Sequence, residues 1–585
     1  MKAKLTVLFV SLLCSLSLMA ENVTVQGTVY DEAGEPIIGA SVTVKGQAAY
    51  GTTTDLDGNF RINAEAGSTL MFSYIGYDAA SYDVKAAARG VSITLTPNVT
   101  QLEEVVAVGY GVQKKSVMSS SVSRVTSDDL DLGHPTTVQN ALKGKVSGVQ
   151  IISNSGQPGA DSKILVRGTG TVNAASPLYI IDGMPSESGI NHLNPSDIES
   201  IEVLKDAASA AIYGARGANG VILVTTKKGT LDQRASLSYE FTYGIQNPSK
   251  KIKLANAREY LLLAREAAAN ANTSFVLQGA EGVDTDWQEA IRYKNAPIMN
   301  HRVSLSGGTK SSTYYASFGY VGQDGIFAKD HARYERYNFR VNYSNTLMDI
   351  QSRNWLNKAT FTAMAAFTQS KTTGNTIGNS EAAGILTSVN MLAPTQAIYQ
   401  TDPDVLAEYE RLYPNRVIAP NGLDYNIIEM REINNPLASM QVNNNQVTKP
   451  RTFTYNFSLD LDVWNDIKFR TTYASEYVMN QVKNVVPVYQ LNTTSYNDNS
   501  YVFDQKKESS YWQWENVLSY NKSFGPHSVG ALLGTTMSSY HFEDLNGTDY
   551  DLLEVNIDKA FIDIATAEES LSKVSSYGAD HRIAS

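Results

Sequence analysis

The side chains that most often do chemistry form no constellation in this sequence. The seven histidines are scattered, and no two of them lie at metal-ligand spacing with a carboxylate. The His-Glu-x-x-His, Gly-x-Ser-x-Gly and phosphate-loop motifs do not occur. The sequence therefore argues against an enzyme, and it predicts no cofactor and no bound metal ion.

Glycine clusters match known binding loops only in part. Gly168-Thr169-Gly170 lacks the third glycine of a dinucleotide fingerprint, and Gly214, Gly217 and Gly220 are three residues apart, which does not match it either. We interpret these glycines as sites of close backbone packing or of turns with positive φ. Asp57-Gly58-Asn59 is similar to a calcium loop but has no closing glutamate, so a turn is favoured over a metal site.

One short segment has the pattern of a protein-binding strand. Residues 103–111 form a compact apolar stretch with polar residues on both sides. The free N–H and C=O groups of such a strand can add it to the edge of a partner's sheet. Alternatively, the strand completes the domain before or after it, and the pattern alone favours neither interpretation.

Composition narrows the class of protein. The chain has 585 residues, enough for several domains, and 48 Lys and Arg against 59 Asp and Glu give a net charge of −11. This acidic balance argues against a nucleic-acid partner. A mean hydropathy of −0.24, with no long apolar run after the first twenty residues, excludes a helical membrane protein. A membrane β-barrel stays possible, because its alternating strands average out as polar.

The first twenty residues have the layout of a secretory signal peptide. Lys2 and Lys4 precede an apolar stretch from Leu5 to Leu18, and Ala20 offers a small residue for cleavage. We expect residues 1–20 to be removed on export. The single cysteine, Cys14, lies in this segment, so the exported chain would hold no disulfide.

Two zones with different strand patterns follow. Residues 21–98 contain about seven short strands separated by turns, which predicts a β-sandwich. Residues 116–229 mix α and β signals. A short helix is predicted over 137–146, and strands over 149–153, 163–167, 178–182 and 221–226.

From residue 230 onward, nine or ten segments of about ten residues alternate between apolar and polar side chains. In one of them Tyr337, Phe339, Val341 and Tyr343 alternate with Asn338, Arg340, Asn342 and Ser344. A soluble sandwich gives the same alternation. Aromatic residues near segment ends, and long connections such as 369–449 beside tight ones such as 463–467, favour an antiparallel membrane barrel.

Together these segments resemble the SusC/RagA family of TonB-linked outer-membrane proteins, found in Bacteroidota. The opening zone resembles a carboxypeptidase-regulatory-like (transthyretin-like) sandwich, and residues 102–115 resemble the TonB box and its linker, with Ala107 in place of a usual valine. The stretches 165–168, 177–183, 201–206 and 211–222 match the family's plug domain. The resemblance assigns to the TonB box Glu104, Val105, Val106, Ala107, Val108, Gly109, Tyr110 and Gly111. It assigns to the plug signature Arg167, Gly168, Asp182, Gly183, Tyr213, Gly214, Arg216, Gly217, Asn219 and Gly220.

The resemblance implies a mainly β fold in five parts. These are the signal peptide (1–20), the sandwich (21–98), the TonB box and linker (99–115), the α+β plug (116–229) and part of a 22-stranded barrel (230–585). It also implies active import of a nutrient, a glycan or a peptide, across the outer membrane. The implied partners are TonB with ExbB and ExbD, a SusD-like lipoprotein, outer-membrane lipid and the nutrient itself.

The length does not agree with a complete transporter. Plugged transporters use 22 strands, whereas residues 230–585 supply nine or ten, and the stretch 575–585 is not predicted to be a barrel-closing strand. Unpaired strand edges in lipid cost several kcal/mol per group. We therefore expect a fragment of a longer product or a truncated, vestigial transporter, with a surface binding protein as a further alternative. The sequence does not indicate the substrate.

Overall fold

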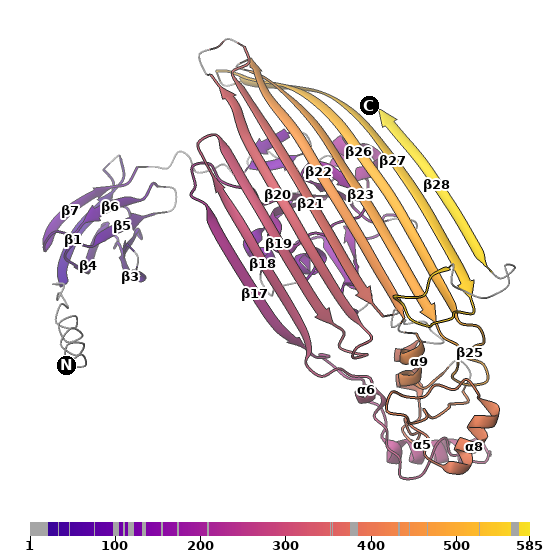
Figure 1. Cartoon of the computed structure of the whole chain (residues 1–585). Helices are drawn as coiled ribbons and strands as arrows, with labels where there is room; N and C mark the ends of the chain where they lie inside the picture. The colour runs from indigo at the N-terminus through magenta and orange to yellow at the C-terminus, as the bar shows by residue number, and fades with distance from the viewer. Residues whose placement is uncertain are drawn as a thin grey trace, which may run out of the picture. The chain divides into compact units, whose positions relative to one another are not determined.

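The structure is a computed structural model of the chain (Figure 1). It describes residues 22–32, 34–45, 47–74, 77–96, 105–108, 111–114, 122–131, 136–153, 156–171, 175–206, 210–350, 353, 355–374, 384–430, 433–443, 445–464, 466–525, 527–562 and 572–584. The predicted signal peptide lies outside these residues. The chain divides into two compact units, one built around the N-terminal sandwich and the other around the plug and a large sheet.

The first unit is the predicted β-sandwich. Its two sheets are β4 (Asn59–Glu65), β1 (Asn22–Tyr30) and β7 (Ala88–Thr94), and β3 (Gln47–Thr53), β2 (Ser41–Val44), β5 (Thr69–Ser73) and β6 (Ala80–Asp83). Alternate residues of β4 are buried, as the period of two predicts. Val25, Val29, Leu70 and Phe72 are fully buried between the sheets and form the centre of the core.

The segment that is similar to a calcium loop forms a turn. Asp55 Oδ1 accepts hydrogen bonds from the backbone N–H groups of Asp57, at 3.0 Å, and Asn59, at 2.8 Å. Gly58 has a φ of +73°, which glycine adopts without strain. The carboxylate therefore binds its own backbone, and the described residues include no cluster of three or more potential metal ligands.

The plug is a five-stranded mixed sheet with small helices around it. Its strand order is β10 (Val122–Thr126), β15 (Ile198–Leu204), β16 (Val221–Thr226), β13 (Leu178–Ile181) and β14 (Met184–Ser186). Beside it lie the hairpin β11 (Val149–Ser153) and β12 (Ser162–Val166), and the helices α2 (Ser127–Asp131), α3 (Val138–Leu142), η2 (Pro195–Asp197) and η3 (Ala211–Gly217). The core is aliphatic, with Ile198, Ile201, Val203 and Ile222 fully buried. The predicted helix and strands of this zone agree with the structure to within a few residues.

The rest of the second unit is an antiparallel sheet of ten strands in sequence order (Figure 1). The strands are β17 (Ser236–Gln246), β18 (Ala296–Gly308), β19 (Ser312–Asp324), β20 (Arg333–Asp349), β21 (Lys358–Thr373), β22 (Gln446–Trp464), β23 (Ile467–Val486), β26 (Tyr501–Phe524), β27 (His527–Tyr550) and β28 (Lys573–Ala584). Among the residues that the structure describes, β17 and β28 do not pair with each other, so the sheet is open.

One sequence-based expectation for this sheet needs an addition, and another needs correction. The stretch 575–585 lies largely within β28, which pairs with β27 from Lys573 to Ala584, although it does not close the sheet. The strands are also longer than the expected ten residues, and β26 and β27 have 24 residues each. The halves of β26 and β27 that lie nearer the lobe carry charged residues, such as Lys506 and Lys507 of β26. These charges interrupt the apolar–polar alternation in the sequence.

The connections between strands differ at the two ends of the sheet. At one end, tight turns join β18 to β19, β22 to β23 and β26 to β27, and a somewhat longer one joins β20 to β21. At the other end, long connections fold into a lobe with its own small cores, one around Trp287 and one around Tyr425. The lobe contains α5 (Ala257–Asn270), α6 (Trp287–Ala290), α7 (Ile385–Met391), α8 (Pro403–Leu412), α9 (Pro436–Val442), β24 (Tyr489–Gln490) and β25 (Tyr496–Asn497) (Figure 1). The connection expected over 369–449 is therefore partly helical, and β21 extends into it.

The helices among the described residues are short, and the longest, α5, has 14 residues. No helix of the described residues is both long and apolar enough to span a membrane.

Candidate functional site: the contact between plug and sheet

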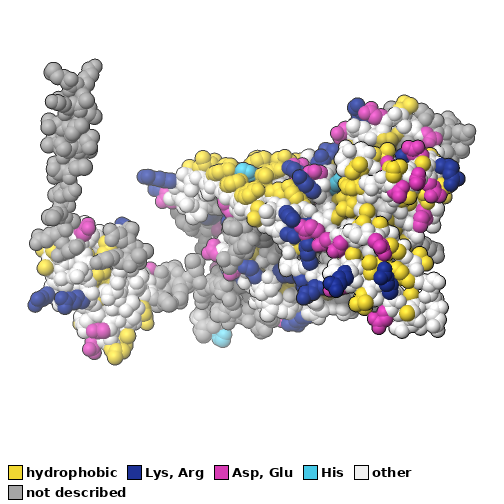
Figure 2. Space-filling model, turned by 90° about the horizontal axis from the view of Figure 1, so that it is seen from below, with side chains coloured by type: hydrophobic (Ala, Val, Ile, Leu, Met, Phe, Trp, Pro, Cys, Tyr) yellow, Lys and Arg dark blue, Asp and Glu magenta, His cyan; other side chains and the backbone are white. Residues whose placement is uncertain are grey.

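The two faces of the large sheet differ in chemistry. Along β20, Arg336, Asn338, Arg340 and Asn342 are buried toward the plug. The residues that alternate with these four along β20 point away from the plug. Among them, Tyr337, Phe339 and Tyr343 are 40–48% exposed. Figure 2 shows hydrophobic side chains gathered over the sheet, along the upper edge of the view. The charged side chains lie mostly over the rest of the visible surface. The sheet thus has a polar face that holds the plug and an aromatic face that a lipid bilayer would cover.

A first group of contacts surrounds Asp182, at the end of β13. Its carboxylate accepts hydrogen bonds from Thr226 N, at 2.9 Å, and Thr226 Oγ1, at 2.7 Å, which joins two strands of the plug. Arg340 Nη1 lies 3.5 Å from Asp182 Oδ2 and 3.2 Å from Thr226 Oγ1. Asn456 of β22 donates to the Asp182 carbonyl at 3.1 Å. Asp182 therefore connects the plug to two strands of the sheet.

The backbone at Asp182 is unusual for a non-glycine residue. Its φ is +48°, in the left-handed region, and the following Gly183 has a φ of +90°. Aspartate tolerates this region better than most residues do. The Asp-Gly pair therefore makes the tight turn into β14 and keeps a carboxylate at the contact with the sheet.

A second group of contacts connects the 3₁₀-helix η2 to β18 and β19. Tyr315 Oη donates to Asp197 Oδ1 at 2.8 Å and accepts from Arg302 Nη2 at 2.8 Å. Arg302 Nε also lies 3.5 Å from Asp197 Oδ1. Asp197 and Tyr315 are buried, so the pairing satisfies groups that would otherwise be costly to enclose.

A third group of contacts holds the plug segment that follows β14. Glu476 of β23 is 1% exposed. Its Oε1 accepts from the backbone N–H groups of Glu187 and Ser188, at 3.1 and 3.2 Å. Its Oε2 accepts from the hydroxyls of Ser186 and Ser188, at 2.8 and 3.0 Å. Four donors thus surround one buried carboxylate, the arrangement that best compensates for its burial.

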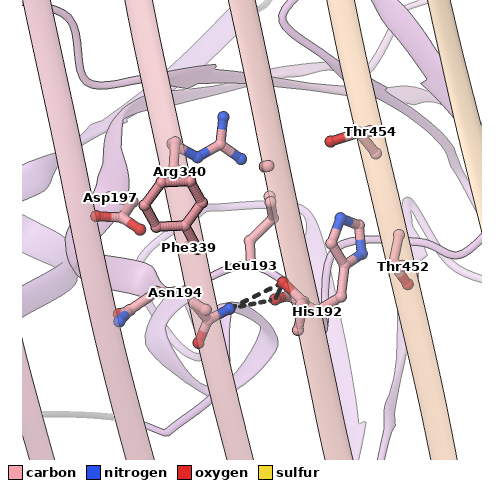
Figure 3. A pocket seen from close by; sticks show the side chains of 11 residues that line it. His192, Leu193, Asn194, Asp197, Phe339, Arg340, Thr452 and Thr454 are labelled. Atoms are coloured by element: carbon pink, nitrogen blue, oxygen red, sulfur yellow. Dashed lines mark hydrogen bonds between the residues drawn. The ribbon is translucent and has the colours of Figure 1, made fainter.

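His192 lies a few residues further along the same plug segment (Figure 3). Its carbonyl accepts from Asn338 Nδ2 at 2.9 Å and Thr368 Oγ1 at 3.2 Å, and both donors belong to the sheet. Part of the residue retains accessible surface, but its ring atom Nε2 is enclosed. Burial, together with the charges of Arg340 and Arg336, lowers the pKa of His192 to about 3, so the imidazole is neutral at physiological pH.

The predicted plug-signature residues all belong to the plug, and about half of them, including Arg167 and Arg216, are exposed on its surface. Arg167, with a φ of +57°, pairs with Asp206 at 2.5 Å, and Arg216 pairs with Glu187 at 2.6 Å. A β-carbon at Gly217 would come within 2.8 Å of the Ala210 carbonyl oxygen, so this glycine permits close backbone packing. Other signature residues, Gly168, Gly183, Gly214 and Gly220, have positive φ.

The main contact residues on the sheet were not predicted from the sequence. They include Glu476, Arg336, Tyr315 and Asn456, each of which lies on the buried face of an alternating strand. A charged or amide side chain on the polar face of such a strand is the signal that could have identified them. The plug partners of Glu476, Arg336 and Tyr315 lie between Ser186 and Asp197 and carry no motif, whereas the partner of Asn456 is the signature residue Asp182.

The structure describes the predicted TonB box only in part. Val105–Val108 forms β8 and Gly111–Lys114 forms β9, and these two strands pair with each other. Glu104, Gly109 and Tyr110 lie outside the described residues. The extended backbone agrees with the strand that the sequence predicts for Val105–Val108.

Comparisons with known proteins define the class. The TonB-dependent receptor plug domain matches residues 114–221, and the carboxypeptidase-regulatory-like domain matches residues 25–107. The TonB-dependent receptor SusC of Bacteroides thetaiotaomicron is 31% identical over 93% of this chain and 53% of its own length. The TonB-dependent receptor P3 of Formosa agariphila is 33% identical over 89% of this chain and 48% of its own length.

Among solved structures, the RagAB peptide importer in its closed-closed state has the same fold. The match has a TM-score of 0.65 and 20% identity, and it covers 80% of this chain and 52% of that one. A plug held on the polar face of a large antiparallel sheet, preceded in the sequence by a small sandwich domain, is typical of a TonB-dependent receptor. The chain contains the plug domain of TonB-dependent receptors and is similar in sequence to members of the SusC/RagA family, and it spans about half the length of the curated relatives it matches. These relatives are receptors and not enzymes, in agreement with the sequence.

Proposed function

We propose that this chain is part of an outer-membrane receptor that imports a nutrient in a TonB-dependent manner. The observation that supports this most strongly is the buried polar contact between plug and sheet. Asp182, Asp197 and the segment after β14 are held by Arg340, Tyr315 and Glu476 through hydrogen bonds and ion pairs rather than by a large apolar interface. Such contacts can exchange with water when the plug moves, whereas a broad apolar interface would resist separation.

The predicted TonB box is the proposed point of attachment. A strand that binds through its main chain depends little on side-chain identity, which suits a segment that is pulled. In this proposal Val105–Val108 pairs with TonB in the periplasm, and ExbB and ExbD supply the energy. The boundaries proposed for the parts remain 1–20, 21–98, 99–115, 116–229 and 230–585.

A SusD-like lipoprotein is the proposed partner at the lobe end of the sheet. The similarity to SusC and to the RagAB importer supports this pairing, and it also supports a glycan or a peptide as the nutrient. Co-purification of a lipoprotein with the native receptor tests the partner. Growth of a deletion strain on single glycans and peptides tests the substrate class, with loss of growth on one nutrient as the expected result.

Cross-linking in living cells tests the attachment to TonB. A photoreactive amino acid at position 106 should give an adduct with TonB during growth on the nutrient. The same amino acid at position 61, an exposed site on β4 of the sandwich, serves as the matched control and should give none. Equal adducts at both positions, or none at position 106, would contradict the proposed role of the box.

A further inference from the structure

The starting point is the proton on His192. Ser188 Oγ lies 3.0 Å from Glu476 Oε2 and 3.2 Å from His192 Nδ1. A hydroxyl has one proton, and a carboxylate is a stronger acceptor than a neutral imidazole nitrogen. Ser188 therefore donates to Glu476 and accepts from His192 Nδ1. This places the ring proton on Nδ1 and leaves a lone pair on Nε2.

The lone pair on Nε2 has no donor among the described residues. Nε2 is buried and has no hydrogen-bond partner there. Burial, together with the charges of Arg340 and Arg336, lowers the pKa of the His192 ring, so a doubly protonated ring is not an alternative at neutral pH. The atom needs a donor that can reach it inside the contact between plug and sheet.

A small cavity with a mixed polar and apolar lining adjoins this residue. It lies between the plug segment 192–197 and strands β20, β21 and β22, and the hydroxyl residues Thr452 and Thr454 of β22 line it (Figure 3). Figure 3 shows the imidazole of His192 beside these two threonines. Both threonines are buried, and neither hydroxyl bonds to another described residue. The space open to the centre of a water-sized molecule is about 10 Å³, close to the minimum that one water requires.

We propose that this cavity is a binding site for one structural water, which donates to His192 Nε2 and bonds to the hydroxyls of Thr452 and Thr454. A water molecule fits because one of its hydrogens can bond to Nε2 and the other to one threonine hydroxyl. Its oxygen can accept a hydrogen bond from the second hydroxyl. A metal ion does not fit, because two guanidinium groups lie near the ring. The water joins the plug to β22 at a point where the protein groups do not meet directly.

The first test is a structure of the native receptor, purified in detergent, at a resolution that shows ordered water. We expect one density peak within hydrogen-bond distance of His192 Nε2 and of one threonine hydroxyl. In the double variant Thr452→Val and Thr454→Val, which preserves shape but removes both hydroxyls, the peak should be absent. Thr448→Val, elsewhere on β22, is the matched control and should keep it. No peak in the native receptor, or a direct bond from a threonine to Nε2, would overturn the proposal.

The second test records the protonation of the ring itself, independently of the threonine variants. The ¹⁵N chemical shifts of the imidazole distinguish the two neutral tautomers, and solid-state NMR of ¹⁵N-histidine-labelled receptor in lipid can record them. The His192 signal, assigned by its loss in His192→Gln, should report a proton on Nδ1 and a hydrogen-bonded, unprotonated Nε2. A proton on Nε2 would overturn the assignment of the water as donor.

Discussion

Glu476 and Ser188 are 288 residues apart in the sequence, yet the Glu476 carboxylate accepts a hydrogen bond from the Ser188 hydroxyl at 3.0 Å. The same carboxylate also accepts from Ser186 Oγ and from two backbone N–H groups. One buried side chain of the sheet therefore fixes the conformation of the plug segment after β14. This segment continues to His192, whose carbonyl is held by β20 and β21.

Replacing Glu476 should loosen this segment of the plug. Glu476→Gln keeps the shape but removes the charge and turns one acceptor into a donor, so all four hydrogen bonds lose their charged partner and the two serine hydroxyls must reverse direction to bond to the amide. Each bond to a charged group contributes about 1.5–3 kcal/mol. We expect amide hydrogen exchange at Glu187 and Ser188 to accelerate by about tenfold or more. Glu543→Gln, at a 66% exposed glutamate of β27, should leave the exchange unchanged. Equal protection in both variants would contradict the anchoring role.

Replacing Asp182 should weaken the contact with β20 without disturbing the turn. Asp182→Asn keeps a side chain that tolerates the φ of +48°, but removes the charge facing Arg340. We expect a loss of about 1–3 kcal/mol in the free energy of plug unfolding, measured by hydrogen exchange across β13 and β16. Asp182→Ala should lose more, because it also strains the backbone. A larger effect for asparagine than for alanine would be inconsistent with this explanation.

The hydroxyl of Tyr315 should contribute measurably to the second group of contacts. Tyr315→Phe removes one donor to Asp197 and one acceptor for Arg302, so two buried charged groups each lose a partner. We expect a destabilisation of about 1–3 kcal/mol. Tyr314, which directly precedes Tyr315 on β19, points to the other face of the sheet. Tyr314→Phe therefore serves as the control. Comparable losses of stability in both variants would show that the hydrogen bonds of the Tyr315 hydroxyl do not stabilise the protein more than the Tyr314 hydroxyl does.

The stability of the plug contact should depend on pH through His192. Its pKa in the folded protein, about 3, is below the ordinary value of 6.5. The neutral ring therefore contributes stability that is fully present above about pH 6.5 and is lost as the pH falls toward 3, with a slope of up to about 1.4 kcal/mol per pH unit. His192→Gln should flatten this dependence, whereas His527→Gln, at the exposed first residue of β27, should not. An unchanged slope in His192→Gln would show that other groups control the acid sensitivity.

The sequence predicted much of the architecture because the dominant forces there are local. The alternation of Tyr337, Phe339 and Tyr343 with Asn338, Arg340 and Asn342 specifies a strand with one polar and one apolar face, and the structure has both faces. The strands Val149–Ser153 and Val221–Thr226 were predicted with the observed bounds, because turn residues flank continuous apolar runs.

The candidate site was less predictable because it depends on long-range pairing. Nothing near Glu476 in the sequence indicates that its partners are Ser186 and Ser188, since the pairing follows from how the plug is placed against the sheet. Asp182 was singled out by the family motif, but its contact with Arg340 was not. The strand Lys573–Ala584 was missed because its sequence is mostly polar and small, and it is ordered by pairing with β27.

Uptake of the nutrient in cells tests the central claim most directly. The receptor gene in its native context is compared with an in-frame deletion of the codons for residues 104–111, in cells with and without TonB, at matched surface levels of the receptor. We expect uptake by the native receptor to require TonB, and the deletion to reduce it to the level of TonB-depleted cells. Uptake by the deleted form that equals native uptake, with the receptor present at the cell surface, would contradict the account.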